Sequence, residues 1–213
     1  MRSPQTSKPE INAHAFRVLG VDPAVAGATG YGIVEFAGSA PRLVRFGALK
    51  LPAHTAFASR LREIHSLISR LVAEFLPDAI AVESVFTALN MRTALKLAEV
   101  RGVVLLAAAQ ASVPAHSYSP REVKSSVAGY GAASKQQMQQ MVTSALGLTE
   151  YPEPADAADA LAVALCHAHL ARARDRFVVA MGTRAAAVAS RSLARELPIA
   201  SGNRTASARV SKL

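Results

Sequence analysis

Three runs of mostly apolar residues near the start of the chain predict β-strands. They cover residues 16–22, 30–38 and 42–51, and short turns containing Gly, Pro or Ser separate them. Connections this short join antiparallel neighbours, because a parallel pair needs a crossover of a dozen or more residues. The first part of the chain is therefore predicted to be an antiparallel meander.

The pattern then changes to a helical period. Apolar residues recur at three- and four-residue spacing over 55–75, until Pro77 ends the repeat. Short apolar runs at 79–83 and 115–118 predict two more strands, and helices are predicted over 93–111, from about 120, over 135–146 and from about 154 onward. This order predicts an α/β fold with a five-stranded mixed sheet, in which the meander leads into parallel strands and helices flank the sheet.

Composition divides the chain into three parts. Residues 1–15 are polar and predicted to be a flexible extension, 16–174 the folded domain, and 175–213 a basic tail that is disordered or partly helical. Residues 1–170 hold 15 Lys and Arg against 13 Asp and Glu, whereas 171–213 hold 9 against 2. Most of the net charge of +9 therefore belongs to the tail and says little about what the folded part binds.

No apolar stretch reaches the ~20 residues of a membrane span, and the N-terminus lacks the apolar core of a secretory signal. The single cysteine, Cys166, cannot form an internal disulfide. We therefore expect a protein of the reducing cytoplasm that has no membrane partner.

Two carboxylates follow buried strands. Asp22 ends the first strand and Glu83 ends the strand at 79–83. Either residue alone is typical of a solvated strand end. If the two strands are parallel neighbours, however, both carboxylates leave the sheet at the same end, where α/β sheets bind ligands.

Two more carboxylates lie three residues apart at the start of the last predicted helix. Asp156 and Asp159 share a face there, although acidic residues in a first turn also simply complement the helix dipole. If all four carboxylates converge, their repulsion calls for divalent cations. An oxygen-only ligand set favours Mg²⁺ or Mn²⁺, and two such ions hydrolyse phosphodiesters. The four acids together predict a metal-dependent nuclease.

Eight stretches, in order from Val18 to His167, resemble the RuvC family of Holliday-junction resolvases in the ribonuclease H-like superfamily. They are VLGVDP, TGYGIVE, AVESVF, NMRTALKL, VRGVVLLAAA, YSPREVK, VAGYGAASKQQM and PADAADALAVALCHA, and they cover about 70% of the chain. One departure is Ala24, which stands where the family usually has Gly, in a turn that is one residue longer than is typical.

The resemblance implies a ribonuclease H-like fold and a homodimer that nicks a four-way DNA junction symmetrically, with two metal ions in each active site and a branch-migration motor as a partner. It places the family's acidic tetrad on the same four residues that the chemistry selects. It also assigns DNA contacts to Lys124 and Lys135, and a junction-inserting aromatic to Phe86, which core packing would also explain.

Other functions remain to be separated from this one. A ribonuclease H-like nuclease for RNA or RNA–DNA hybrids and a catalytically inactive junction-binding scaffold would share the fold. An actin-like phosphotransferase needs two lobes, and about 155 residues are too few for them. The spacing of Cys166, His167 and His169 does not favour zinc, and we treat the terminal Ser-Lys-Leu as coincidental.

Overall fold

The structure is a computed structural model, and it describes residues 15–25, 27–38, 40–84 and 90–174. Contacts divide the chain into two units, Met1–Arg172 and Ala173–Leu213, and the description that follows concerns the first. None of the described helices is long and apolar enough to cross a bilayer.

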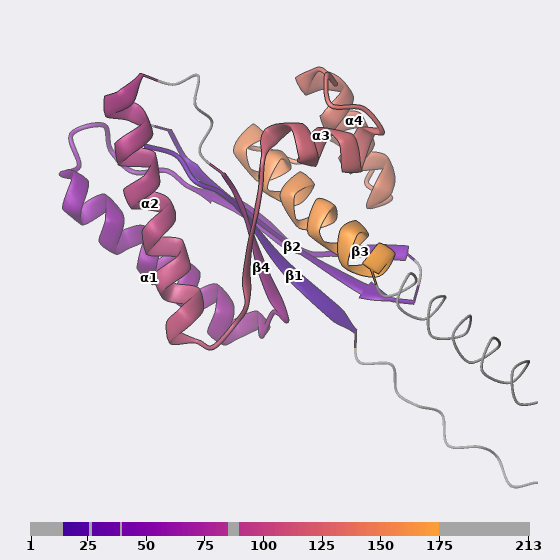
Figure 1. The fold of residues 1–213 in the computed structure, drawn as a ribbon, viewed down its shortest axis with the longest axis horizontal. Coiled ribbons are helices and arrows are strands. Elements are labelled where there is room, and N and C mark those ends of the chain that lie inside the picture. Colours follow the sequence, from indigo (N-terminus) through magenta and orange to yellow (C-terminus); the bar gives the residue numbers. More distant parts are fainter. Residues whose placement is uncertain (1–14, 26, 39, 85–89, 175–213) are drawn as a thin grey trace, which may run out of the picture. The chain divides into compact units, whose positions relative to one another are not determined.

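Five strands form one mixed sheet in the order β3-β2-β1-β4-β5 (Figure 1). β1 (Phe16–Asp22), β2 (Thr29–Ala37) and β3 (Ala40–Leu49) make the antiparallel meander, while β4 (Ala79–Glu83) and β5 (Ala115–Tyr118) run parallel to β1. The predicted fold class and strand arrangement are confirmed.

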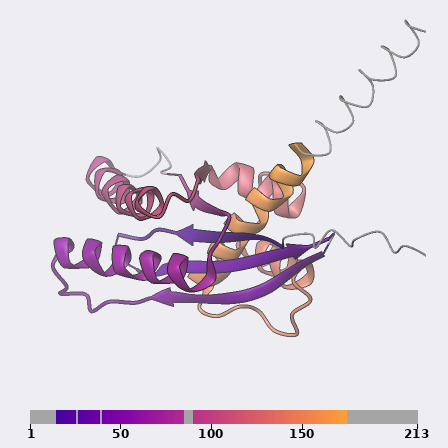
Figure 2. The same cartoon turned by 90° about the horizontal axis from the view of Figure 1, so that it is seen from below.

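Helices cover both faces of the sheet (Figures 1 and 2). α1 (Phe57–Phe75) and α2 (Met91–Gln110) lie on one face; α3 (Pro120–Ala128), α4 (Lys135–Ala145) and a last helix, described over 155–174, lie on the other. Alternate residues of β1 serve the two cores: Leu19 and Val21 pack with α1 and α2, and Val18 packs with the last helix.

Side-chain caps determine where several helices begin. Asn90 accepts a hydrogen bond from the backbone of Thr93, so α2 begins two residues earlier than the apolar pattern predicts. Ser119 and Glu122 form a capping box at the start of α3, and Ser134 with Gln137 forms one at the start of α4. The second box makes Lys135 the first residue of its helix, which matters for the site.

Candidate active site

Asp22 and Glu83 leave the sheet side by side. β1 and β4 are parallel neighbours, with Val21 paired to Val82, so the next residue on each strand is a carboxylate at the same edge. Their carboxyl groups are hydrogen-bonded to each other. The structure therefore brings together the two predicted strand-end acids.

The last helix reaches this edge because three glycines let its backbone approach the sheet. A Cβ on Gly20 would lie 2.1 Å from the carbonyl oxygen of Ala160, and one on Gly32 would lie 2.6 Å from the side chain of Leu161. Gly20 and Gly32 are cross-strand partners, so together they form a groove across β1 and β2.

The third glycine lies beside the site itself. Gly30 is the cross-strand partner of Asp22, and a Cβ on it would lie 1.9 Å from the carbonyl oxygen of Asp156. The missing side chain at Gly30 therefore sets how closely the start of the last helix approaches Asp22. The sequence reasoning did not identify these glycines, although VLGVD and TGYG already display them.

The four acids influence one another electrostatically. Burial, followed by the negative charges of Glu83, Asp159 and Asp156, raises the pKa of Asp22 to about 8. Burial also raises the pKa of Glu83, an effect that Asp159 strengthens. The hydrogen bond from Asp22 and the charge of Lys124 oppose the rise at Glu83. The site is thus a concentration of negative charge with little compensation.

The two predicted lysines lie at the same site. Lys135 Nζ is 3.1 Å from Asp159 Oδ2, and this contact raises the pKa of Lys135. Lys124 and Lys135, with Glu83 and Asp159, line a hollow of about 240 Å³ beside α3 and α4. Both lysines therefore border the same hollow as two of the acids.

The donor set suits a hard divalent cation. All four candidates offer carboxylate oxygens, which Mg²⁺ and Mn²⁺ prefer, and the raised pKa of Asp22 reports negative charge that such an ion would neutralise. Within the described residues, no three His, Cys, Asp or Glu side chains stand in positions that could hold a metal ion as they are. The ion pair between Asp159 and Lys135 is exposed to solvent, so it holds the Asp159 carboxylate only weakly.

Phe86 and the pair Cys166 and His167 have different outcomes in the structure. Phe86 lies outside the described residues, and its insertion into a junction stays a prediction. Cys166 and His167 are buried in the core; burial raises the pKa of the Cys166 thiol to about 11, and His167 Nδ1 lies 2.7 Å from the hydroxyl of Tyr118. Both residues pack the last helix against the sheet.

Comparison with known proteins now identifies the family. The model of the family "Crossover junction endodeoxyribonuclease RuvC" matches residues 18–167. The chain belongs to the RuvC family. The RuvC protein of Chloroflexus aurantiacus is 48% identical over 161 residues, which cover 76% of this chain and 98% of that protein.

Solved RuvC structures share the fold. The structure of Thermus thermophilus RuvC in complex with a Holliday junction substrate has 37% sequence identity and a TM-score of 0.70, covering 74% of this chain and 95% of that one. The yeast mitochondrial Holliday junction resolvase Ydc2 has 16% identity and a TM-score of 0.51, which shows a common fold. The predicted family is confirmed.

Proposed function

We propose that this RuvC-family chain resolves four-way DNA junctions by hydrolysing phosphodiesters at the acidic site, with Asp22, Glu83, Asp156 and Asp159 holding two Mg²⁺ or Mn²⁺ ions. The observation that carries this proposal is the convergence of these carboxyl groups from two strands and one helix. Burial, together with the charges of Glu83, Asp159 and Asp156, raises the pKa of Asp22 there to about 8. Family membership as a crossover junction endodeoxyribonuclease supports the choice of substrate.

The ions, when bound, supply a nucleophilic water at neutral pH and stabilise charge on the leaving oxygen. The chain's own residues arrange the reaction. Asp22 and Glu83 hold the ligand oxygens at the rigid sheet edge, and the last helix presents Asp156 and Asp159 from the side. Lys124 and Lys135 contact the phosphate and offset the charge that develops during displacement.

A homodimer follows from the need for two symmetric nicks, and α2 offers a surface for it. Met91, Leu95 and Leu106 are 74%, 58% and 51% exposed, and their spacing places them on one side of the helix. Gly102 lies on the same side, and a Cβ added to it would meet no atom within 4 Å. An apolar helix face with a small residue at its centre suits close packing against a second copy of α2.

Three further expectations complete the proposal. Phe86 follows Glu83 by three residues and inserts into the opened junction. A branch-migration motor is the partner in recombination and DNA repair, and the reaction takes place in the bacterial cytoplasm. These rest on the family resemblance.

A nicking assay on a synthetic four-way junction tests the proposal. We expect paired symmetric nicks with magnesium or manganese, and none with a chelator. Linear duplex and an RNA–DNA hybrid of the same sequence serve as matched substrates. Preferential cutting of the hybrid would indicate an RNA-directed nuclease. Tight binding of the junction without cleavage in any divalent cation would indicate an inactive scaffold.

A further inference from the structure

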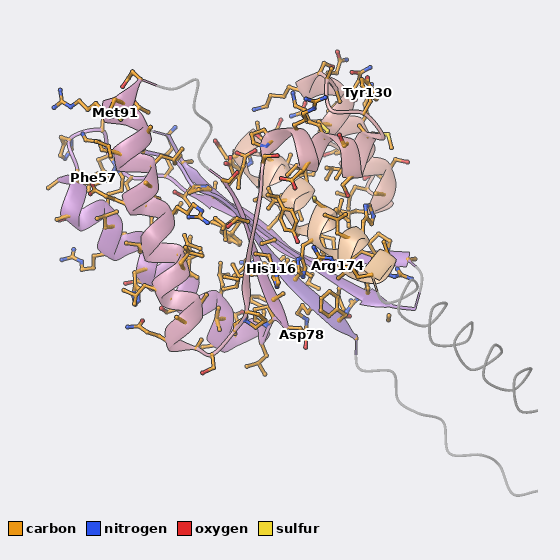
Figure 3. All side chains as sticks on the ribbon, viewed as in Figure 1. Phe57, Asp78, Met91, His116, Tyr130 and Arg174 are labelled. Atoms are coloured by element: carbon orange, nitrogen blue, oxygen red, sulfur yellow. The ribbon has the colours of Figure 1, made fainter. Side chains whose placement is uncertain are left out.

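A second and larger cavity lies on the other side of the acidic site. It has a volume of about 880 Å³ and lies between the turn after β1, the segment after β3, and the first turns of α1 and α2. Asp156 forms part of its wall. Figure 3 shows Phe57, which also lines it, at the opposite end of the α1 layer from Asp78, so the cavity lies at the end where β1 and β4 deliver their acids.

The charged residues of this cavity are mostly cationic. Its lining holds Lys50, Arg60 and Lys96 against one carboxylate, Asp156. The rest of the lining is apolar or small, apart from Thr55. A concave site with several cations and low-dielectric walls attracts a polyanion.

Arg60 is the most informative of these residues. It is only 7% exposed, yet among the described residues it has no carboxylate within ion-pairing distance. Its guanidinium donates one long hydrogen bond, 3.4 Å, to the carbonyl oxygen of Gly27. A buried cation without a counter-ion is costly, and a guanidinium is well suited to bind a phosphate through two hydrogen bonds.

The two lysines stand nearer the solvent. Lys96 Nζ lies 5.4 Å from the centre of the Phe57 ring, a cation–π contact that keeps the ammonium at the cavity wall. Lys50 is exposed at the end of β3. Within the described part of the chain neither lysine has an ion pair, so both are free to contact phosphates.

The two hollows lie on either side of the acids. The smaller one includes Glu83 and Asp159, and the larger one includes Asp156. A strand whose phosphate is cut at the acids must continue away from them in both directions. The smaller hollow accounts for one direction through Lys124 and Lys135, and the larger cavity is open in the other.

We propose that the cavity formed by Lys50, Arg60 and Lys96 binds the phosphates of the cleaved DNA strand on one side of the scissile bond. This inference rests on the proposed function, because it assigns the path of the same substrate. Arg60 holds one phosphate inside the cavity, while Lys50 and Lys96 hold phosphates at its rim. The subsite positions the strand by its backbone and reads no base.

Single neutral phosphates test this assignment. Each test junction carries a single methylphosphonate, and the position of this neutral group differs from one junction to the next, on either side of the cut. Binding is measured by fluorescence anisotropy with calcium in place of magnesium. For the natural chain, we expect affinity to fall about two- to tenfold when the contacted phosphate is neutral. The Lys96→Ala and Lys50→Ala variants should bind the junction with all phosphates intact more weakly than the natural chain does. In these variants, a methylphosphonate at the contacted position should no longer lower the affinity.

Arg70→Ala is the matched control. Arg70 is exposed on α1 ten residues beyond Arg60, about 15 Å along the helix. We expect it to leave the methylphosphonate pattern unchanged, whereas each cavity variant lowers the salt slope of binding by about 1. The subsite is wrong if the effect of every methylphosphonate on affinity is the same with and without Lys50 or Lys96. It is also wrong if Arg70→Ala abolishes the effect at the same position as the cavity variants do.

The outcomes also separate this subsite from the proposed function. If the chain cuts junctions with magnesium but the cavity variants do not change the methylphosphonate effect, the proposed function stands and the subsite is wrong. A chain that never cuts a junction loses the function whatever the cavity binds. Arg60→Ala is used only where circular dichroism shows a natural fold, because its burial makes it the variant most prone to misfold.

Discussion

The sheet has a carboxylate region at each end, and the two regions differ in the groups that surround their charges. At the amino end of β1, Glu35 receives hydrogen bonds from Arg17 and, at 2.6 Å, from Arg42. These two partners hold the pKa of Glu35 below its usual range. At the carboxyl end, Asp22 has mainly other carboxyl groups around it, and its pKa rises to about 8.

The difference separates stability from function. The arginine-paired end satisfies its buried charge within the chain, and Arg17 also donates from its side chain to the carbonyl oxygen of Phe75 and from its backbone to Asp78. At the acidic end the described residues supply one exposed ion pair, between Lys135 and Asp159, so much of the negative charge stays without a partner. This excess of negative charge destabilises the folded chain and favours the binding of cations. A site that must bind an outside charge cannot already be neutralised from within.

The largest expected effect is on cleavage. Asp22→Asn removes a ligand oxygen at the sheet edge while keeping the size of the side chain, so we expect the single-turnover rate on a four-way junction to fall about a hundredfold or more. Junction binding should be retained or become tighter, because negative charge near the DNA is lost. Normal cleavage by this variant would remove Asp22 from the active site.

A glycine beside the acids should come next. Gly30→Ala forces the start of the last helix away from β2, and a shift of about 1 Å at a catalytic group lowers the rate by up to about a hundredfold. The rate is measured under single-turnover conditions with saturating magnesium. Gly47→Ala is the matched change, because the three atoms nearest to its Cβ would all belong to the Tyr31 side chain and not to the backbone of the last helix. Equal losses in both variants would contradict the positioning role.

Stability at the acidic end should depend on pH and on metal. Because the folded pKa of Asp22 lies above the ordinary value of 3.8, the folded chain loses stability as pH rises from that value to about 8. With a chelator present and at a pH near 8, the free energy of unfolding of Asp22→Asn should exceed that of the natural chain by about 1–3 kcal/mol. Magnesium at a hundredfold excess over its Kd should stabilise the natural chain by about 2.7 kcal/mol and the variant by less.

Thermal unfolding in chelator and in magnesium, followed over this pH range, makes the measurement. A variant whose unfolding temperature follows that of the natural chain at every pH would show that Asp22 carries no unfavourable charge.

The arginine-paired end should respond in the opposite sense and leave cleavage intact. Glu35→Gln weakens two charge-assisted contacts, so we expect unfolding to become easier by about 1–3 kcal/mol near neutral pH. Since the folded pKa of Glu35 lies below the ordinary value of 4.5, its contribution is present above that value and disappears as pH falls through the folded pKa. Urea unfolding over this range measures it.

Glu63→Gln is the control for this variant. Glu63 pairs with Arg62 at 3.1 Å, but its side chain is 41% exposed against 7% for Glu35, so we expect its loss to cost less than about 1 kcal/mol. A junction-cleavage rate that falls with Glu35→Gln would show that the two ends are not independent.

The elements followed from local pattern because their periods and stop signals are local. The first strand, the helix ending before Pro77 and the strand at 79–83 were predicted close to their observed bounds. The starts of α1 and α2 were less accurate, by two residues each. At α2 the Asn90 cap, and not the apolar spacing, decides the first residue, whereas α1 begins after Ala56 without a side-chain cap. The four acids were named from strand ends and a helix start, while their catalytic and metal-binding roles remain predictions.

The cavity beyond Asp156 could not be predicted in the same way. Lys50 comes from the segment after β3, and Arg60 and Lys96 come from two different helices, so nothing in their spacing relates them. A lysine or arginine on a helix is most often a solvated surface residue, so the burial of Arg60 becomes visible only when the helices pack on the sheet.

The amino-acid sequence by itself determined the order of the elements, the alternation that gives each strand two faces, and the family, because these depend on neighbours along the chain. Tertiary structure alone decided how close the acids come, which buried carboxylate has a cation beside it, and where a cationic cavity opens. Those properties are set by distances between segments far apart in sequence, and a charge acquires its pKa from whatever the fold places within a few ångströms of it.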